Sequence, residues 1–197
     1  MPKPSNREKI LAEGMRVVHE RGYSGASVRD IANAAGVPLG SFTSHFSSKE
    51  AFSLEVLNQY FSANAQLVAR TLQNESISPL ERLQYYLDTI ISSLNQNGCW
   101  NGCLIGNFCA EASEHSELIR KRLVEIFNEM ESAIGTCLQA AVDAGELRAE
   151  IDCADIAAFT ISSLQGAILQ SKAERCSIPV ERFKRVLFTS VLCKNDS

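Results

Sequence analysis

Apolar residues recur at spacings of three and four along nearly the whole chain, which is the period of an amphipathic helix. No stretch alternates apolar and polar residues for long enough to predict a β-sheet. The pattern therefore predicts an all-α fold of about nine helices. The expected helices are residues 6–21, 28–35, 38–46, 48–73, 79–97, a short segment from 104, 116–144, 154–173 and 179–192.

Residues 27–46 (SVRDIANAAGVPLGSFTSHF) predict two short helices joined by a tight turn. Ser27 is a suitable N-cap for the first helix, and Pro38 suits the start of the second, where a missing N–H costs nothing. Phe42 and Phe46 lie one turn apart and are expected to face inward. The outward positions carry side chains able to approach a surface: Leu39, Gly40, Ser41, Thr43, Ser44 and His45. This arrangement predicts a helix-turn-helix whose second helix lies in the DNA major groove.

The expected contacts with DNA follow from this geometry. Ser27 and Lys49, at helix starts, are expected to hold phosphates, whereas the outward face of the second helix meets base edges. Two assignments leave an alternative open, since Arg29 can pair with Asp30 or another nearby acid and His45 can cap its own helix. The full predicted set is Ser27, Arg29, Pro38, Leu39, Gly40, Ser41, Thr43, Ser44, His45 and Lys49.

The segment GYSGASVRDIANAAGVPLGSFTSHFSSKEAF resembles the DNA-binding segment of TetR/AcrR-type transcriptional repressors, and the resemblance extends back through REKILAEGM. It departs from the family pattern at three positions. The family usually has Thr at the position of Ala26, often has Lys at that of Leu39, and usually has Tyr at that of Thr43. The resemblance implies a repressor with a DNA-binding domain (residues 1–50) and an effector-binding and dimerisation domain (residues 51–197). It also implies release from a palindromic operator when a small molecule or electrophile acts on the second domain.

Residues 154–173 and 179–192 carry more apolar surface than a helix at the edge of a bundle needs. They can complete the core of one subunit, and periodicity alone does not exclude this. The family resemblance favours a homodimer in which these two helices of each chain form a four-helix bundle. Two heads then bind two half-sites about 34–36 Å apart.

Composition and charge limit the possible partners. Of the 197 residues, 45% are hydrophobic and 21% are charged, which are globular values. No apolar run approaches the ~20 residues that span a bilayer, and the N-terminus lacks the apolar core of a signal peptide, so a cytoplasmic protein without a membrane partner is expected. Residues 1–50 hold seven basic and five acidic residues, whereas the remainder holds 12 and 18. The basic excess is therefore confined to residues 1–50, the segment that contains the helix-turn-helix, where it favours attraction to phosphate.

Cys99, Cys103 and Cys109 form the densest cluster among seven cysteines, all expected to be reduced. One interpretation is an electrophile or oxidant sensor, and the pattern GCLIGN is similar to a branch of the family that includes such sensors. The alternative is that they are small hydrophobic core residues. Their spacing fits no common zinc site, so neither a metal nor a cofactor is expected.

A ligand pocket is implied by the family plan for the helices that follow the head. Aromatic and methionine side chains are the candidates for its walls, although such residues are more often plain core. The predicted ligand-binding or sensing set is Cys99, Trp100, Cys103, Phe108, Cys109, Glu111, Phe127, Met130, Phe159 and Gln165. No nucleotide-binding glycine loop or hydrolase elbow occurs, so no catalytic residue is expected. A thiol-dependent enzyme using Cys103 and a helical protein-interaction adaptor remain the alternatives.

Overall fold

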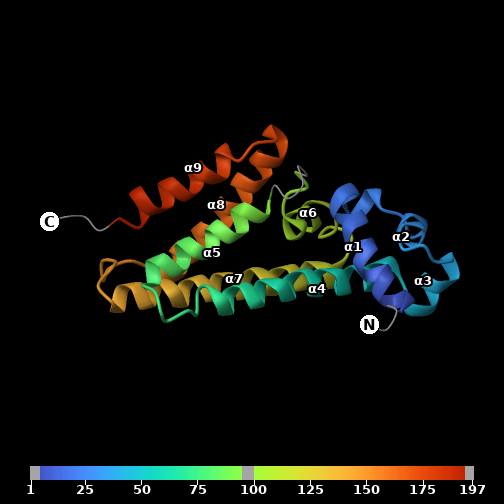
Figure 1. The fold of residues 1–197 in the computed structure, drawn as a ribbon, viewed down its shortest axis with the longest axis horizontal. Helices are drawn as coiled ribbons and strands as arrows, with labels where there is room; N and C mark the ends of the chain where they lie inside the picture. Colours follow the sequence, from blue (N-terminus) through green and yellow to red (C-terminus); the bar gives the residue numbers. More distant parts are fainter. Residues whose placement is uncertain (1–4, 95–99, 194–197) are drawn as a thin grey trace. The chain divides into compact units, whose positions relative to one another are not determined.

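The computed structural model describes residues 5–94 and 100–193, and helices are the only regular elements within these two ranges (Figure 1). This confirms the predicted all-α fold. The elements are α1 (Asn6–Gly25), α2 (Val28–Ala34), α3 (Leu39–His45), α4 (Lys49–Arg70), α5 (Pro79–Ser93), α6 (Leu104–Glu111), α7 (Glu117–Asp143), α8 (Cys153–Glu174), α9 (Ile178–Val186) and a π-helical turn (Leu187–Val191). None of the described helices combines the length and the apolar character needed to cross a membrane.

The chain packs as two compact units that do not correspond to a single cut in the sequence. The head unit comprises Met1–Ser62 and Leu104–Val124, and the body unit comprises Ala63–Cys103 and Glu125–Ser197. Helices α4 and α7 therefore begin in the head unit and end in the body unit. Helix α6 packs with the head unit. The predicted division into a DNA-binding domain (residues 1–50) and an effector-binding and dimerisation domain (residues 51–197) stays a prediction.

Three phenylalanine rings form the centre of the head unit. The ring of Phe52 lies 5.4 Å from that of Phe42 and 5.2 Å from that of Phe46, and all three side chains are buried. Gly14 of α1 meets this cluster, where a Cβ atom would lie 2.5 Å from Cζ of Phe52 and 2.7 Å from Cγ2 of Ile31. Glycine at this position therefore lets α1 approach α2 and α4 closely.

Most helices match their predicted ranges to within a few residues, with differences at their ends. The first helical stretch of α1 ends at Arg21 as expected, because Gly22 is non-helical (φ 78°, ψ 169°), and a short second stretch then runs to Gly25. The last predicted helix is divided, because its α-helical part ends at Val186 and a π-helical turn follows. Residues 95–97 of the expected fifth helix lie outside the described residues.

The body unit is built around α5, α7 and α8, with α9 packed along α8 (Figure 1). Its core is formed by buried side chains such as Leu83 of α5, Leu138 of α7 and Leu164 of α8. An ion pair between Lys184 and Asp88 joins α9 to α5. These contacts fix the C-terminal helices, on whose surface the candidate dimer interface lies.

Candidate DNA-binding surface and effector region

The start of α2 carries the predicted cap. The Ser27 hydroxyl accepts a hydrogen bond from the Asp30 N–H (3.1 Å), and the Asp30 carboxylate accepts one from the Ser27 N–H (3.0 Å). Hydrogen bonds from Ser27 hold the pKa of the Asp30 carboxyl below its usual value. Asp30 also pairs with Arg21 (3.2 Å between Nη1 and Oδ1), a contact that the sequence analysis missed. Within the described ranges Arg29 forms no ion pair, and its side chain is exposed beside this cap.

Helix α3 divides into a buried and an exposed face, as predicted. Phe42 is 2% exposed and Phe46 is 3% exposed, whereas Leu39 is 45% exposed. The Thr43 hydroxyl donates to the carbonyl of Gly40 (3.1 Å), and the Ser44 hydroxyl donates to that of Ser41 (2.9 Å). Both hydroxyl oxygens keep lone pairs able to accept from a base. Apart from Leu39, the outward face of α3 therefore carries small or polar residues. The remaining predicted positions on or beside this face are half-buried (Ser41) or exposed (Pro38, Gly40, Thr43, Ser44 and His45).

Lys49, predicted to contact a phosphate, lies against Tyr23 in the head unit. Its half-buried ammonium donates to the carbonyl of Tyr23 and lies 4.5 Å from the centre of the Tyr23 ring. Burial lowers the pKa of Lys49, and the nearby Glu111 carboxylate opposes this effect. The ammonium is thus engaged within the head unit, and its contact with a phosphate stays a prediction.

A small polar cluster lies in the body unit and includes two of the predicted effector residues. The Gln165 side-chain amide donates to Sγ of Cys103 (3.5 Å), and the fully buried Tyr86 donates its hydroxyl to Oδ1 of Asn64 (2.9 Å). Burial raises the pKa of Tyr86 well above its usual value, and the thiol of Cys103 adds to this increase. Asn64 was not predicted, although a buried tyrosine hydroxyl generally needs a partner.

Nine of the ten predicted effector residues are described, and they belong to two packing units. Phe108, Cys109 and Glu111 lie on α6 in the head unit, where the Phe108 ring is 5.6 Å from that of Tyr23. The body unit contains Trp100, Cys103, Phe127, Met130, Phe159 and Gln165. Met130 is 5% exposed and Phe159 is 47% exposed, so the first lies in the core and the second on the surface. Cys99 lies outside the described residues.

The six cysteines within the described ranges are free thiols. Cys137 is buried, donates to the carbonyl of Pro79 (3.2 Å), and has its thiol pKa raised to about 11 by burial. Such a thiol is a poor nucleophile, because the reactive form is the thiolate. No group of three or more possible metal ligands occurs in the described part of the chain.

Helices α8 and α9 expose an apolar surface. Phe159, Leu169 and Val186 are 47%, 67% and 42% exposed. On α8 the stripe continues through Gly166, where a Cβ atom would meet open space, so the glycine is not required by the fold of one chain. Exposed apolar side chains gathered on one surface are a candidate interaction site. A groove of about 310 Å³ runs along it, lined by Phe159, Ser163, Ala167, Gln170, Pro179, Arg182, Phe183, Val186 and Leu187.

Comparison with known proteins explains both halves of this arrangement. Residues 10–56 match the model of the bacterial regulatory proteins of the tetR family, and residues 79–187 match the tetracyclin repressor-like C-terminal domain. The chain belongs to the TetR family. It is a DNA-binding transcriptional repressor of that family and not an enzyme, so the alternative of a thiol-dependent enzyme is not supported.

Similar TetR-family proteins match over nearly the full chain. The HTH-type transcriptional repressor DhaR of Mycobacterium sp. (strain GP1) is 40% identical over 192 residues, which cover 98% of this chain and 95% of DhaR. The structure of reduced Escherichia coli NemR has a TM-score of 0.87 and 26% identity, covering 98% of this chain and 99% of that one. A cysteine mutant of the regulator CifR in complex with 26-bp operator DNA has a TM-score of 0.79 and 25% identity, covering 94% and 98%.

Proposed function

We propose that the protein represses transcription in the cytoplasm as a homodimer that binds a palindromic operator and is released when an effector acts on its body unit. The observation that carries this proposal is α3, whose small and polar outward face covers a buried phenylalanine core. A helix of this kind can enter the major groove without steric conflict. The operator complex of the CifR mutant supports the same mode of binding.

The dimer uses the apolar surface of α8 and α9. One short reading helix makes few contacts, whereas two heads on one duplex multiply the binding and require an inverted repeat. In each head, Thr43 and its neighbours on α3 meet base edges, and Arg29 holds a phosphate. Base contacts give the sequence preference, and phosphate contacts give position and affinity.

The effector site lies at the cluster of Cys103, Gln165 and Tyr86. Cys103 is the residue immediately before α6, so a group added to its sulfur lies next to the start of that helix. In the proposed step the Cys103 thiolate attacks a carbon of a quinone C=C bond. The C–S bond forms as that π bond breaks, the electron pair moves to the carbonyl oxygen, and a proton from solvent completes the adduct. The NemR structure in a reduced form and the CifR cysteine mutant support a role for a thiol. A ligand shifts the equilibrium between two states only if it binds them with different affinity. The adduct must therefore be more stable in the DNA-free state than in the DNA-bound state.

Treatment with a quinone tests this function. We expect the untreated protein to bind a duplex selected from a random pool, with affinity that falls steeply with salt, and the treated protein to bind it at least about fivefold more weakly. Cys103→Ser should bind equally well before and after treatment, because serine does not form the adduct. The measurement is fluorescence anisotropy of labelled duplex, with mass spectrometry to locate the modified cysteine.

Cys176→Ser is the matched control. Cys176 is a free thiol that follows the C-terminal end of α8 and does not belong to the proposed cluster. It should lose affinity on treatment as the wild type does. If Cys103 is fully modified and the affinity for DNA is unchanged, the proposed release by modification of Cys103 is contradicted.

A further inference from the structure

The carboxylate of Glu111, at the end of α6, lies directly against Gly22 of α1. A Cβ atom on Gly22 would be 2.3 Å from Oε1 and 2.5 Å from Oε2 of Glu111, so the acid fills the space that a side chain would need. Oε2 also accepts a hydrogen bond from the backbone N–H of Ser24 (3.0 Å). Gly22 has φ 78° and ψ 169°, a conformation that is essentially restricted to glycine. Glu111 therefore contacts both residues that flank Tyr23 in the sequence, Gly22 and Ser24.

Tyr23 is held by a second set of contacts. Its carbonyl accepts from the ammonium of Lys49, and its ring lies 5.6 Å from the ring of Phe108 on α6. The Glu111 charge favours the protonated form of Lys49 and opposes the effect of burial on its pKa. Residues 22–24, which we term the α1 end, are thus each fixed by a side chain from α4 or α6.

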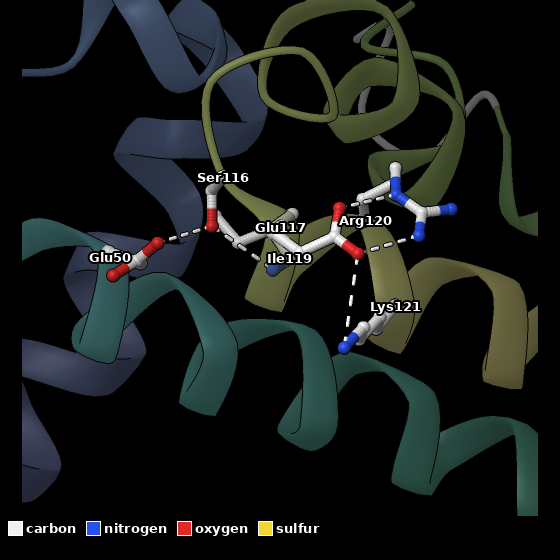
Figure 2. Close-up of polar contacts among 6 residues, drawn as sticks. All are labelled: Glu50, Ser116, Glu117, Ile119, Arg120 and Lys121. Atoms are coloured by element: carbon white, nitrogen blue, oxygen red, sulfur yellow. Dashed lines mark hydrogen bonds and ion pairs between the residues drawn. The ribbon is translucent and has the colours of Figure 1, made fainter.

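The connection from α6 to α7 is tied to the same part of α4. The hydroxyl of Ser116 donates to the carboxylate of Glu50, the residue next to Lys49, and accepts from the N–H of Ile119 (3.1 Å). Figure 2 shows this contact beside the pairing of Glu117 with Arg120 and Lys121, which stays within α7. Residues 111–116 are therefore attached to the head unit at both ends.

We propose that Glu111 is a positioning residue for DNA binding: by holding the α1 end it sets where α2, and with it α3, is presented. Helix α2 begins at Val28, four residues after Ser24, so a displacement of the α1 end is passed on through a very short connection. Glu111 acts on the head and is not a contact for the effector. This inference rests on the proposed binding of DNA by α3.

The test compares Glu111→Ala and Glu111→Gln with the control Glu114→Ala. Glu114 is an exposed acid three residues further on, and its removal changes the net charge equally. Amide hydrogen exchange of Ser24 in the free protein and the affinity for the selected duplex are measured well below the unfolding temperature. For Glu111→Ala we expect Ser24 to exchange faster and the affinity to fall about tenfold. Glu111→Gln should lie between, because its amide oxygen still accepts, and Glu114→Ala should match the wild type.

The two readouts separate the possible outcomes. Faster exchange of Ser24 with unchanged DNA affinity would show a merely structural contact and overturn the proposal. Unchanged exchange would show that the contact itself is absent, and this measurement needs no DNA, so it fails independently of the proposed function. Since linkage is reciprocal, the duplex should slow Ser24 exchange in the wild type.

A double-mutant cycle with Gly22→Ala gives a second test. Alanine at this backbone conformation is strained in either background, so that cost cancels, and only the conflict with the Glu111 carboxylate differs. We expect Gly22→Ala to weaken DNA binding less when residue 111 is already alanine. Strictly additive effects would contradict a direct coupling of these two residues.

Discussion

Replacing Leu169 by arginine is expected to make the protein monomeric and to weaken its binding to a palindromic duplex by about a hundredfold or more. Leu169 is 67% exposed on α8, on the apolar surface that we assign to the dimer. A guanidinium there would be buried without a partner when two chains associate, which strongly disfavours association. A monomer then binds with one head and loses the gain of two linked sites.

Sedimentation velocity measures the oligomeric state, and anisotropy of labelled duplex measures the affinity. Leu118→Arg is the matched control, because Leu118 is a similarly exposed leucine (58%) on the head-unit part of α7. It should leave the dimer intact. A Leu169→Arg protein that remains dimeric would place the interface elsewhere.

Replacing Phe52 by alanine is expected to cost about 3–5 kcal/mol of stability in the head unit and to abolish sequence-specific DNA binding. The Phe52 ring is fully buried and contacts the rings of Phe42 and Phe46. Phe42 lies on the buried face of α3, and Phe46 directly follows that helix. Without it a cavity is left beneath the reading helix, and α3 loses its fixed position.

Thermal unfolding followed by circular dichroism should show an early transition for the head unit of Phe52→Ala, with the body unit unfolding as in the wild type. Tyr85→Ala, at an aromatic residue that is 50% exposed in the body unit, serves as the control and should shift neither transition appreciably. Equal behaviour of the two variants would contradict the central role of the phenylalanine cluster.

The helices and the two faces of α3 were predictable from the sequence because both depend on local signals. A spacing of three and four residues defines the buried side of a helix, and the cap at Ser27 forms among residues three apart. The end of the first helical stretch at Arg21 was also predictable, since a glycine after a helical run commonly ends the helix, whereas the short stretch that follows to Gly25 carries no such local signal.

Contacts distant in sequence account for what the sequence analysis missed. Glu111 accepts a hydrogen bond from the N–H of Ser24, 87 positions away, and this contact was not predicted. The donation of the Lys49 ammonium to the carbonyl of Tyr23 was not predicted either, and the expected roles of both residues toward a ligand and a phosphate stay predictions. In both cases the residue type was recognised as important, but a charged side chain in a sequence does not show which surface it will meet.

Selection of duplexes from a random pool tests the central claim, that α3 of two heads reads DNA, most directly. The wild type should enrich an inverted repeat, and Thr43→Ala should recover the same repeat with relaxed preference at one position in each half. Arg29→Ala, as the phosphate-contact control, should keep the full preference and bind all sequences more weakly. If the wild type enriches no sequence, or if Thr43→Ala keeps the full preference of the wild type, the account is contradicted.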